Sequence, residues 1–217
     1  MAGRSVREEK VEATKEAILT AAERLFAEYG VYNVSNRQIS NAAGQGNTTA
    51  VNYHFGNKTD LVRAISRRHT EQIELIRDRF VAETRGSTAL RDWVACMVRP
   101  VTEHLDSLGS PTWYARFNAQ VTADPALYEA IATEPATAPS LLTLLDGLNA
   151  CLPDLPPTVQ AARGIMARHL IVQTCVERER ALAGGESCPP SVWTDTANLL
   201  IDALTGLWNA PVSGSVS

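Results

Sequence analysis

The sequence lacks the marks of several large protein classes. None of its cysteines stands at CxxC spacing, and no histidine lies at zinc-ligand spacing from them. It contains no run of about 18 apolar residues, and residues 1–10 hold no apolar segment of a secretory signal. We therefore predict single buried thiols in a cytoplasmic protein without a membrane span. The cysteines are Cys96, Cys151, Cys175 and Cys188.

Enzyme signatures are also missing. The chain has no G-x-S-x-G, no phosphate-binding loop, no H-E-x-x-H and no suggestive pair of carboxylates. Alternating strand-like patterns and repeats of 20–50 residues are absent as well. No catalytic residue, metal or cofactor is predicted, and an enzyme is the least favoured class.

Charge is distributed unevenly along the chain. The formal net charge of the 217 residues is −4, which argues against a strongly basic nucleic-acid binder. Residues 1–70 nevertheless carry 10 Lys or Arg against 7 Asp or Glu, whereas residues 71–217 carry 10 against 17. This asymmetry permits the first part to meet a polyanion.

Helical periodicity runs through nearly the whole chain. In residues 14–30, Ile18, Ala22, Leu25, Phe26 and Tyr29 form one stripe; Thr14 can cap its start, and Gly30 can end it. Further helices are predicted from Ser35, from Asn47 and over 57–85, then in several segments up to residue 209, with a kink at Pro100. The fold class is all-α, with a small N-terminal unit of three helices and a larger C-terminal helical body. The predicted domains are 10–56 and 57–210, with a flexible tail at 211–217.

Residues 41–58, NAAGQGNTTAVNYHFGNK, carry the functional signal. A short helix from about Asn36 to Ala43, a turn at 44–46 and a second helix from Asn47 have helix-turn-helix spacing. Small polar side chains at the start of the second helix can approach bases and phosphates. Simple packing of a three-helix unit is the alternative. Candidate DNA-binding residues are Ser35, Arg37, Gly46, Asn47, Thr48, Thr49, Asn52, Tyr53, His54 and Lys58.

Some of these candidates leave an alternative open or depend on the helix register. Arg37 can touch the DNA backbone or form an internal salt bridge. The choice of base-reading residues among Asn47, Thr48, Thr49 and Asn52 depends on where the second helix starts. The basic residues Arg4, Arg7 and Lys10 belong either to an arm that reaches a minor groove or to a disordered tail.

The segments AAERLFAEYGVYNVSNRQISNAAG and AVNYHFGNKTDLVRAI resemble the DNA-binding domain of the tetracycline-repressor (TetR) family, over about residues 14–66. His54 and Lys58 match the family's phosphate-contact positions. This sequence departs from the pattern in having one extra residue between Gly44 and Val51, and Asn52 where the family has tyrosine. The resemblance implies an operator-binding homodimer with an effector pocket in its helical body.

Two residue sets are predicted in that body. Aromatic and polar side chains that favour a small-molecule pocket are Met97, His104, Trp113, Tyr114, Arg116 and Phe117. The alternative is that the aromatic residues only pack in the core. Apolar stripes on the last two helices predict a four-helix bundle shared by two subunits, against the alternative that both helices pack only on their own core. The interface candidates are Ile165, His169, Val172, Val176, Trp193, Ala197, Leu200, Ile201, Leu204 and Trp208.

The favoured function is a DNA-binding transcriptional regulator, a repressor released from its operator by a small-molecule effector. Its expected partners are a pseudo-palindromic double-stranded DNA operator, a second copy of the chain and an effector, with no membrane. The alternative of another class is an all-α interaction protein with a vestigial DNA domain.

Overall fold

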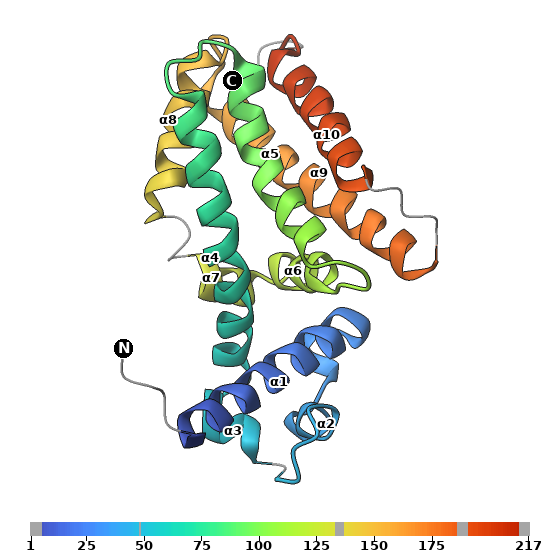
Figure 1. Ribbon diagram of the computed structural model, residues 1–217. Helices are drawn as coiled ribbons and strands as arrows, with labels where there is room; N and C mark the ends of the chain where they lie inside the picture. Colours follow the sequence, from blue (N-terminus) through green and yellow to red (C-terminus); the bar gives the residue numbers. More distant parts are fainter. Residues whose placement is uncertain (1–5, 48, 133–136, 186–190, 213–217) are drawn as a thin grey trace. The chain divides into compact units, whose positions relative to one another are not determined.

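The computed structural model describes residues 6–47, 49–132, 137–185 and 191–212, and every regular element in these ranges is a helix (Figure 1). The elements are α1 (Val6–Tyr29), the short 3₁₀ helix η1 (Val31–Asn33), α2 (Asn36–Ala42), α3 (Ala50–Phe55), α4 (Lys58–Thr84), α5 (Leu90–Ser107), α6 (Tyr114–Ala123), α7 (Pro125–Ala132), α8 (Pro139–Cys151), α9 (Pro157–Ala183) and α10 (Val192–Asn209). The predicted all-α class is confirmed. None of the described helices is both long and apolar enough to cross a membrane.

The chain packs as two compact units. Unit 1 comprises Met1–His69 and Arg116–Ala132, and unit 2 comprises Thr70–Ala115 and Thr133–Ser217. Two of the three divisions fall inside helices, because α4 and α6 each contribute to both units. The predicted domains 10–56 and 57–210 follow the order of the sequence instead, and they stay a prediction.

Unit 1 is built on the apolar stripe of α1. Ile18, Ala22 and Phe26 are fully buried, and the Phe26 ring stacks on Phe117 with centroids 6.3 Å apart. The helix ends as predicted at Gly30, whose amide donates to Phe26 O at 2.9 Å and whose φ of +87° suits glycine. The helix begins earlier than predicted.

The start of α1 lies at Val6, not at Thr14. Thr14 lies inside the helix, where its Oγ1 donates to Lys10 O at 2.9 Å. Arg7 and Lys10 are also helical, so a disordered tail is wrong for these two residues, while Arg4 lies outside the described residues. The polar sequence of this first part gave no periodic signal, because α1 is exposed there.

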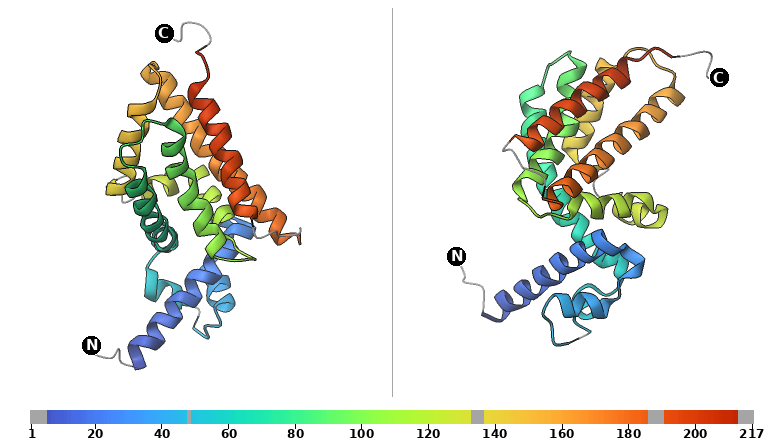
Figure 2. Two further views of the ribbon diagram at one scale, coloured as in Figure 1. Left: turned by 45° about the horizontal axis from the view of Figure 1, so that its top comes forward. Right: turned by 90° about the vertical axis from the view of Figure 1, so that its right-hand side faces the viewer.

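Unit 2 is centred on α5, which packs against α10 on one side and α8 on another (Figure 2). α5 continues through Pro100 to Ser107. Arg163 of α9 is buried and donates to the last carbonyls of α10, to Trp208 O at 2.8 Å and Ala210 O at 2.6 Å. This contact satisfies carbonyls that a helix end leaves without intrahelical donors.

The thiols fit the prediction where they are described. Cys96 and Cys175 are free and buried, and Cys151 is free and partly buried. Burial, together with the neighbouring Glu179 carboxylate, raises the pKa of the Cys175 thiol to about 12. Cys175 is therefore protonated and unreactive at neutral pH. Cys188 lies outside the described residues.

Gly147 allows α8 to approach α5 closely. A Cβ at this position would lie well inside van der Waals contact of three carbons of the buried Trp93 ring. We expect Gly147→Ala to lower the free energy of unfolding by about 1–3 kcal/mol, because the indole must shift in a packed core. Urea unfolding of the purified protein measures this change.

The matched control for this substitution is Gly206→Ala in α10, where a Cβ would meet nothing within 4 Å. It should be neutral or stabilise by up to about 1 kcal/mol, because alanine is the better helix former. Equal effects of the two substitutions would show that the Trp93 contact does not restrict position 147.

Candidate nucleic-acid interface

α2 begins with the cap that its sequence predicts. Ser35 Oγ accepts from Gln38 N at 3.3 Å, and Ser35 N donates to Gln38 Oε1 at 2.8 Å, which completes a capping box. The short helix is anchored by Ile39 and Ser40, which are fully buried. Ser35 is exposed, but its hydroxyl already serves the helix.

The turn after α2 is closed by backbone bonds. Gly44 has a φ of +67°, and Gln45 N donates to Ser40 O at 2.9 Å. Asn47 then folds back on Thr49: its Oδ1 accepts from Thr49 N at 2.9 Å and from Thr49 Oγ1 at 2.7 Å. Gly46 is exposed between these two features.

α3 is shorter than predicted. It begins at Ala50 with Thr49 as N-cap, so Asn47 and Thr49 lie in the turn and not in the helix. The prediction placed the helix start at Asn47, and the Asn47–Thr49 bonds are the physical reason for the later start. Thr48 lies outside the described residues.

The two faces of α3 differ sharply. Ala50 and Val51 are buried and hold the helix on unit 1. Asn52 and Tyr53 are exposed, and Tyr53 has 83% of its surface accessible. Asn52 Oδ1 accepts from Asn36 Nδ2 at 2.6 Å, which ties the start of α2 to α3. This arrangement presents a polar surface on a rigid base.

His54 and Lys58 lie at the junction of α3 and α4. The partly buried His54 ring contacts Tyr53 and Phe55 edge-on, with centroid distances of 4.9 and 6.4 Å. Lys58 Nζ donates to two backbone carbonyls, Val31 O at 3.1 Å and Val34 O at 2.7 Å. The ammonium therefore has an internal role that the sequence did not reveal, and one of its three protons remains for a phosphate.

Arg37 is the exposed cation of α2. Within the described residues it forms no ion pair, which removes support for an internal salt bridge and leaves the guanidinium to solvent or to a ligand. It lies two residues beyond the cap, on the helix that precedes the turn.

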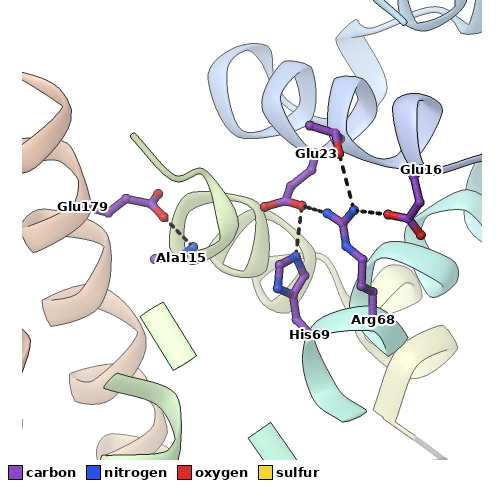
Figure 3. Close-up of polar contacts among 7 residues, drawn as sticks. Glu16, Glu23, Arg68, His69, Ala115 and Glu179 are labelled. Carbon is purple, nitrogen blue, oxygen red and sulfur yellow. Dashed lines mark hydrogen bonds and ion pairs between the residues drawn. The ribbon is translucent and has the colours of Figure 1, made fainter. Parts of the chain in front are cut away.

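A buried ionic cluster holds α4 on α1, as Figure 3 shows. The Glu23 carboxylate, on α1, pairs with the Arg68 guanidinium and lies 2.9 Å from His69 Nε2, both on α4. Glu16 of α1 also pairs with Arg68 at 3.2 Å. Because α4 follows α3 after a two-residue link, this cluster fixes the helix that carries Lys58.

Sequence reasoning missed this cluster and three other buried charged groups, one of which is Arg163 of α9. Glu179 is buried and accepts from Ala115 N at 3.0 Å (Figure 3), and Arg77 is buried beside Glu74. Burial lowers the pKa of Arg77. A signal was present, because Arg77 stands four residues from the buried Ile73 and Val81, on the face that periodicity assigns to the core.

The predicted pocket residues do not fall in one place. His104 and Tyr114 are buried and meet edge-to-face at 5.5 Å in unit 2. Met97 is partly buried beside the Val81–Cys96–Leu144 cluster, and Trp113 is also partly buried.

The other two pocket candidates belong to unit 1. Arg116 is partly buried, and Phe117 packs in the core of that unit against Phe26, so its place in an effector pocket is corrected to a packing role. An aromatic at helical spacing satisfies either role, and only the three-dimensional packing distinguishes them.

Most of the predicted interface residues are also internal. The six on α10 are buried within unit 2, where α10 packs on α5 and α9. They are Trp193, Ala197, Leu200, Ile201, Leu204 and Trp208. Val176 of α9 is buried too. Placing these seven at a subunit surface is therefore a correction. Periodicity shows which face of a helix is apolar but not which neighbour covers it.

A different apolar face is exposed on α9. Ile165, Met166 and Leu170 have 52%, 53% and 38% of their surfaces accessible, and His169 is exposed beside them. Val172 is partly buried. On α10, Leu199 is exposed by 65%. Of the predicted interface set, only Ile165, His169 and Val172 remain accessible.

The exposed candidate residues of unit 1 therefore lie on a capped helix-turn-helix. The family model of bacterial regulatory proteins, tetR family, matches residues 18–65. These residues therefore form a regulatory DNA-binding domain of the tetR family, and they include α2, the turn and α3.

Solved structures of this family have a similar fold. NalD, the secondary repressor of the MexAB-OprM multidrug efflux pump in Pseudomonas aeruginosa, is 26% identical with a TM-score of 0.54 over 90% of this chain and 95% of that chain. A TetR family regulator from Marinobacter aquaeolei VT8 is 18% identical with a TM-score of 0.56, over 90% and 97%. PfmR from Thermus thermophilus is 14% identical with a TM-score of 0.50, over 98% and 100%. No curated protein sequence matches the chain significantly.

Lys58 provides a test with two separable readouts. Lys58→Met should lower the stability of unit 1 by about 2 kcal/mol, because the Val31 and Val34 carbonyls lose a charged donor. It should also lower the slope of log affinity against log salt by about 1, because one phosphate contact is lost. Lys58→Arg serves as the charge-preserving control.

The two measurements are urea unfolding and DNA binding over a range of salt concentrations. An unchanged salt slope with reduced stability would remove Lys58 from the DNA contacts but keep its internal role. A changed preference at a single base pair, with the wild-type slope, would contradict a phosphate contact altogether.

Proposed function

We propose that this regulator is a repressor that reads DNA with the surface of α2, the following turn and α3. The observation that supports this most directly is the two-faced α3, which buries Ala50 and Val51 while leaving Asn52 and Tyr53 exposed. A short helix fixed in this way can enter a major groove without losing its support. The likeness to NalD, which is described as a repressor, supports repression rather than activation of transcription.

The interface residues divide into two roles. Tyr53, His54 and Lys58 have donors that suit phosphate oxygens, which are the same at every sequence. Asn47 and Asn52 use their side-chain oxygens internally, and within the described residues their amide nitrogens have no partner. These nitrogens can donate to acceptors such as guanine O6 or thymine O4 in the major groove.

The remaining candidates support this surface. Arg37 is an exposed cation on α2 that suits a backbone phosphate. Ser35 caps the start of α2, and Gly46 adds no side chain to the turn. Thr49 is exposed at the N-cap of α3 and can contact a base or a thymine methyl.

The protein acts as a homodimer on a pseudo-palindromic operator. α9 has an exposed face that is largely apolar, and such faces commonly bind another protein. Its residues are Ile165, Met166, His169 and Leu170. Leu199 on the adjacent α10 extends the apolar surface. Two copies joined through these helices would form a four-helix bundle, and they would hold two recognition helices for two half-sites.

A small molecule bound in unit 2 releases the repressor. This effector must bind the conformation that does not fit DNA more tightly than the one that does, since only a difference in affinity shifts the equilibrium. The buried pair His104 and Tyr114, whose rings meet edge-to-face at 5.5 Å, offers the mixed aromatic and polar surroundings of a small-molecule site.

Selection of bound fragments from a random double-stranded library tests the proposal. The expected product is an inverted repeat whose half-site centres lie about one helical turn, or a multiple, apart. Sedimentation of the complex should give two chains for each repeat, or a multiple of two. Recovery of fragments with no shared sequence would contradict specific operator binding.

A further inference from the structure

A partly open cavity of about 240 Å³ lies in unit 2, between α4, α5 and α10. Its apolar lining is Phe80, Ala95 and Ile201, and Thr84 and Cys96 lie beside these residues. Cys96 Sγ is 3.2 Å from Thr84 Oγ1 and therefore already has a polar partner. None of the pocket residues predicted from the sequence lines this cavity.

The charged groups of the lining are not equally satisfied. Arg91 pairs with Asp202, and Asp92 accepts from Ser87 Oγ at 2.6 Å. In the part of the chain that the structure describes, Arg99, like Asp92 and unlike Arg91, has no charged partner. Among the described residues its single partner is a neutral one, the Asn198 side-chain oxygen at 3.3 Å.

Arg99 is also placed to reach a ligand. It is partly buried at the middle of α5 and lines both this cavity and a smaller one of about 40 Å³ next to it on the same helix. Two acids, Glu103 and Asp106, line the smaller cavity with Arg99, and Glu103 is paired with Arg79. The Arg99 guanidinium therefore has no ion-pair partner among the described residues, and Asp92 is the carboxylate that shares the cavity lining with it.

We propose that this cavity binds a small aromatic carboxylate, with the carboxylate on Arg99 and the ring on Phe80, Ala95 and Ile201. The size fits, because a cavity of about 150 Å³ holds benzene, and the volume here leaves room for one charged substituent. A guanidinium binds a carboxylate through two parallel N–H donors, which gives both strength and orientation. When the ligand binds, its aromatic ring covers the apolar side chains of the lining and removes their surface from water, which favours binding.

This site goes beyond the proposed function. All of its lining residues belong to unit 2, so ligand binding there can be measured without DNA and does not depend on repression. Because α4 and α10 both line the cavity, a bound ligand would contact both helices. α4 follows the helix-turn-helix, and α10 packs against α9, which carries the exposed apolar face.

Benzoate is the probe, and benzyl alcohol of the same ring size is the neutral control. Both are titrated into the full-length protein and followed by saturation-transfer NMR. We expect benzoate to bind, and we expect benzyl alcohol to bind at least about tenfold more weakly. The alcohol offers the Arg99 guanidinium no charged acceptor. Equal binding of the two probes, or no binding of benzoate, would overturn the proposal.

Two substitutions locate the bound molecule. Arg99→Gln should weaken benzoate binding about tenfold or more, while Arg180→Gln, the same change at an exposed residue of α9, should leave it unchanged. Ala95→Leu should block the cavity and abolish binding in a protein that keeps its helical circular dichroism. Wild-type benzoate affinity in both Arg99→Gln and Ala95→Leu would place the ligand elsewhere and refute this site.

Failure here is distinguishable from failure of the proposed function. A protein that retains operator binding but not benzoate would refute the cavity alone. A protein that binds benzoate through Arg99 but does not bind an operator would refute the proposed repressor function. The proposed ligand site would still stand.

Discussion

Replacing Glu23 with alanine should destabilise unit 1 by about 2–3 kcal/mol, because Arg68 and His69 then lose the carboxylate between them. A fully buried pair costs about 3–5 kcal/mol when one partner is removed. The effect is smaller here because the Arg68 side chain keeps 28% of its surface in contact with water. Native-state hydrogen exchange of α1 amides measures this change, since it reports on unit 1 by itself.

Glu16→Ala provides the matched control. Glu16 pairs with the same Arg68 from the same helix, but its side chain is 55% exposed. An exposed ion pair contributes at most about 1 kcal/mol, so α1 exchange should change little in this variant. If Glu23→Ala and Glu16→Ala had equal effects, the buried cluster would not be what fixes α4 on α1.

A larger loss of function is expected from the exposed face of α9. The double substitution Ile165→Glu and Met166→Glu places two charges where we propose that a second copy packs. The variant should sediment as a folded monomer. Its operator affinity should fall by about 10²–10⁴, because the second half-site is no longer bound at the high effective concentration of a dimer.

The control for this double variant lies on α8. Leu142 and Leu145 are 48% and 38% exposed, and changing both to glutamate adds the same charge to another surface. This control should remain dimeric and bind its operator. A dimeric α9 variant would contradict the proposed interface, and a monomeric α8 variant would move the interface to that helix.

The sequence was sufficient to predict features that depend on local chemistry. Gly30 ends α1, and Ser35 caps α2, because both effects act within one turn of the chain. The all-α class followed from periodicity in the same way. The start of α3 was predicted too early, since the Asn47 side chain competes with the helix for the amide of Thr49.

Features that depend on distant neighbours could not be predicted. Trp208 and Leu204 carry the same apolar signal as a subunit interface, yet α5 and α9 of the same chain cover their helix. The sequence around Glu23 does not indicate that the fold places Arg68 and His69 beside its carboxylate. Lys58 matched a phosphate-contact position, and the structure added two carbonyls from residues 24 and 27 positions earlier.

The central claim is that the exposed face of α3 contacts DNA, and a pair of tyrosines tests it most directly. Tyr53 on α3 is 83% exposed, and Tyr29 at the end of α1 in the same unit is 61% exposed. The affinity of each alanine variant for the selected operator is measured at one salt concentration. Tyr53→Ala should lose about tenfold in affinity, with its unit intact, and Tyr29→Ala should bind as the wild type does. Wild-type affinity in Tyr53→Ala together with a loss in Tyr29→Ala would place the DNA on another surface and contradict the account.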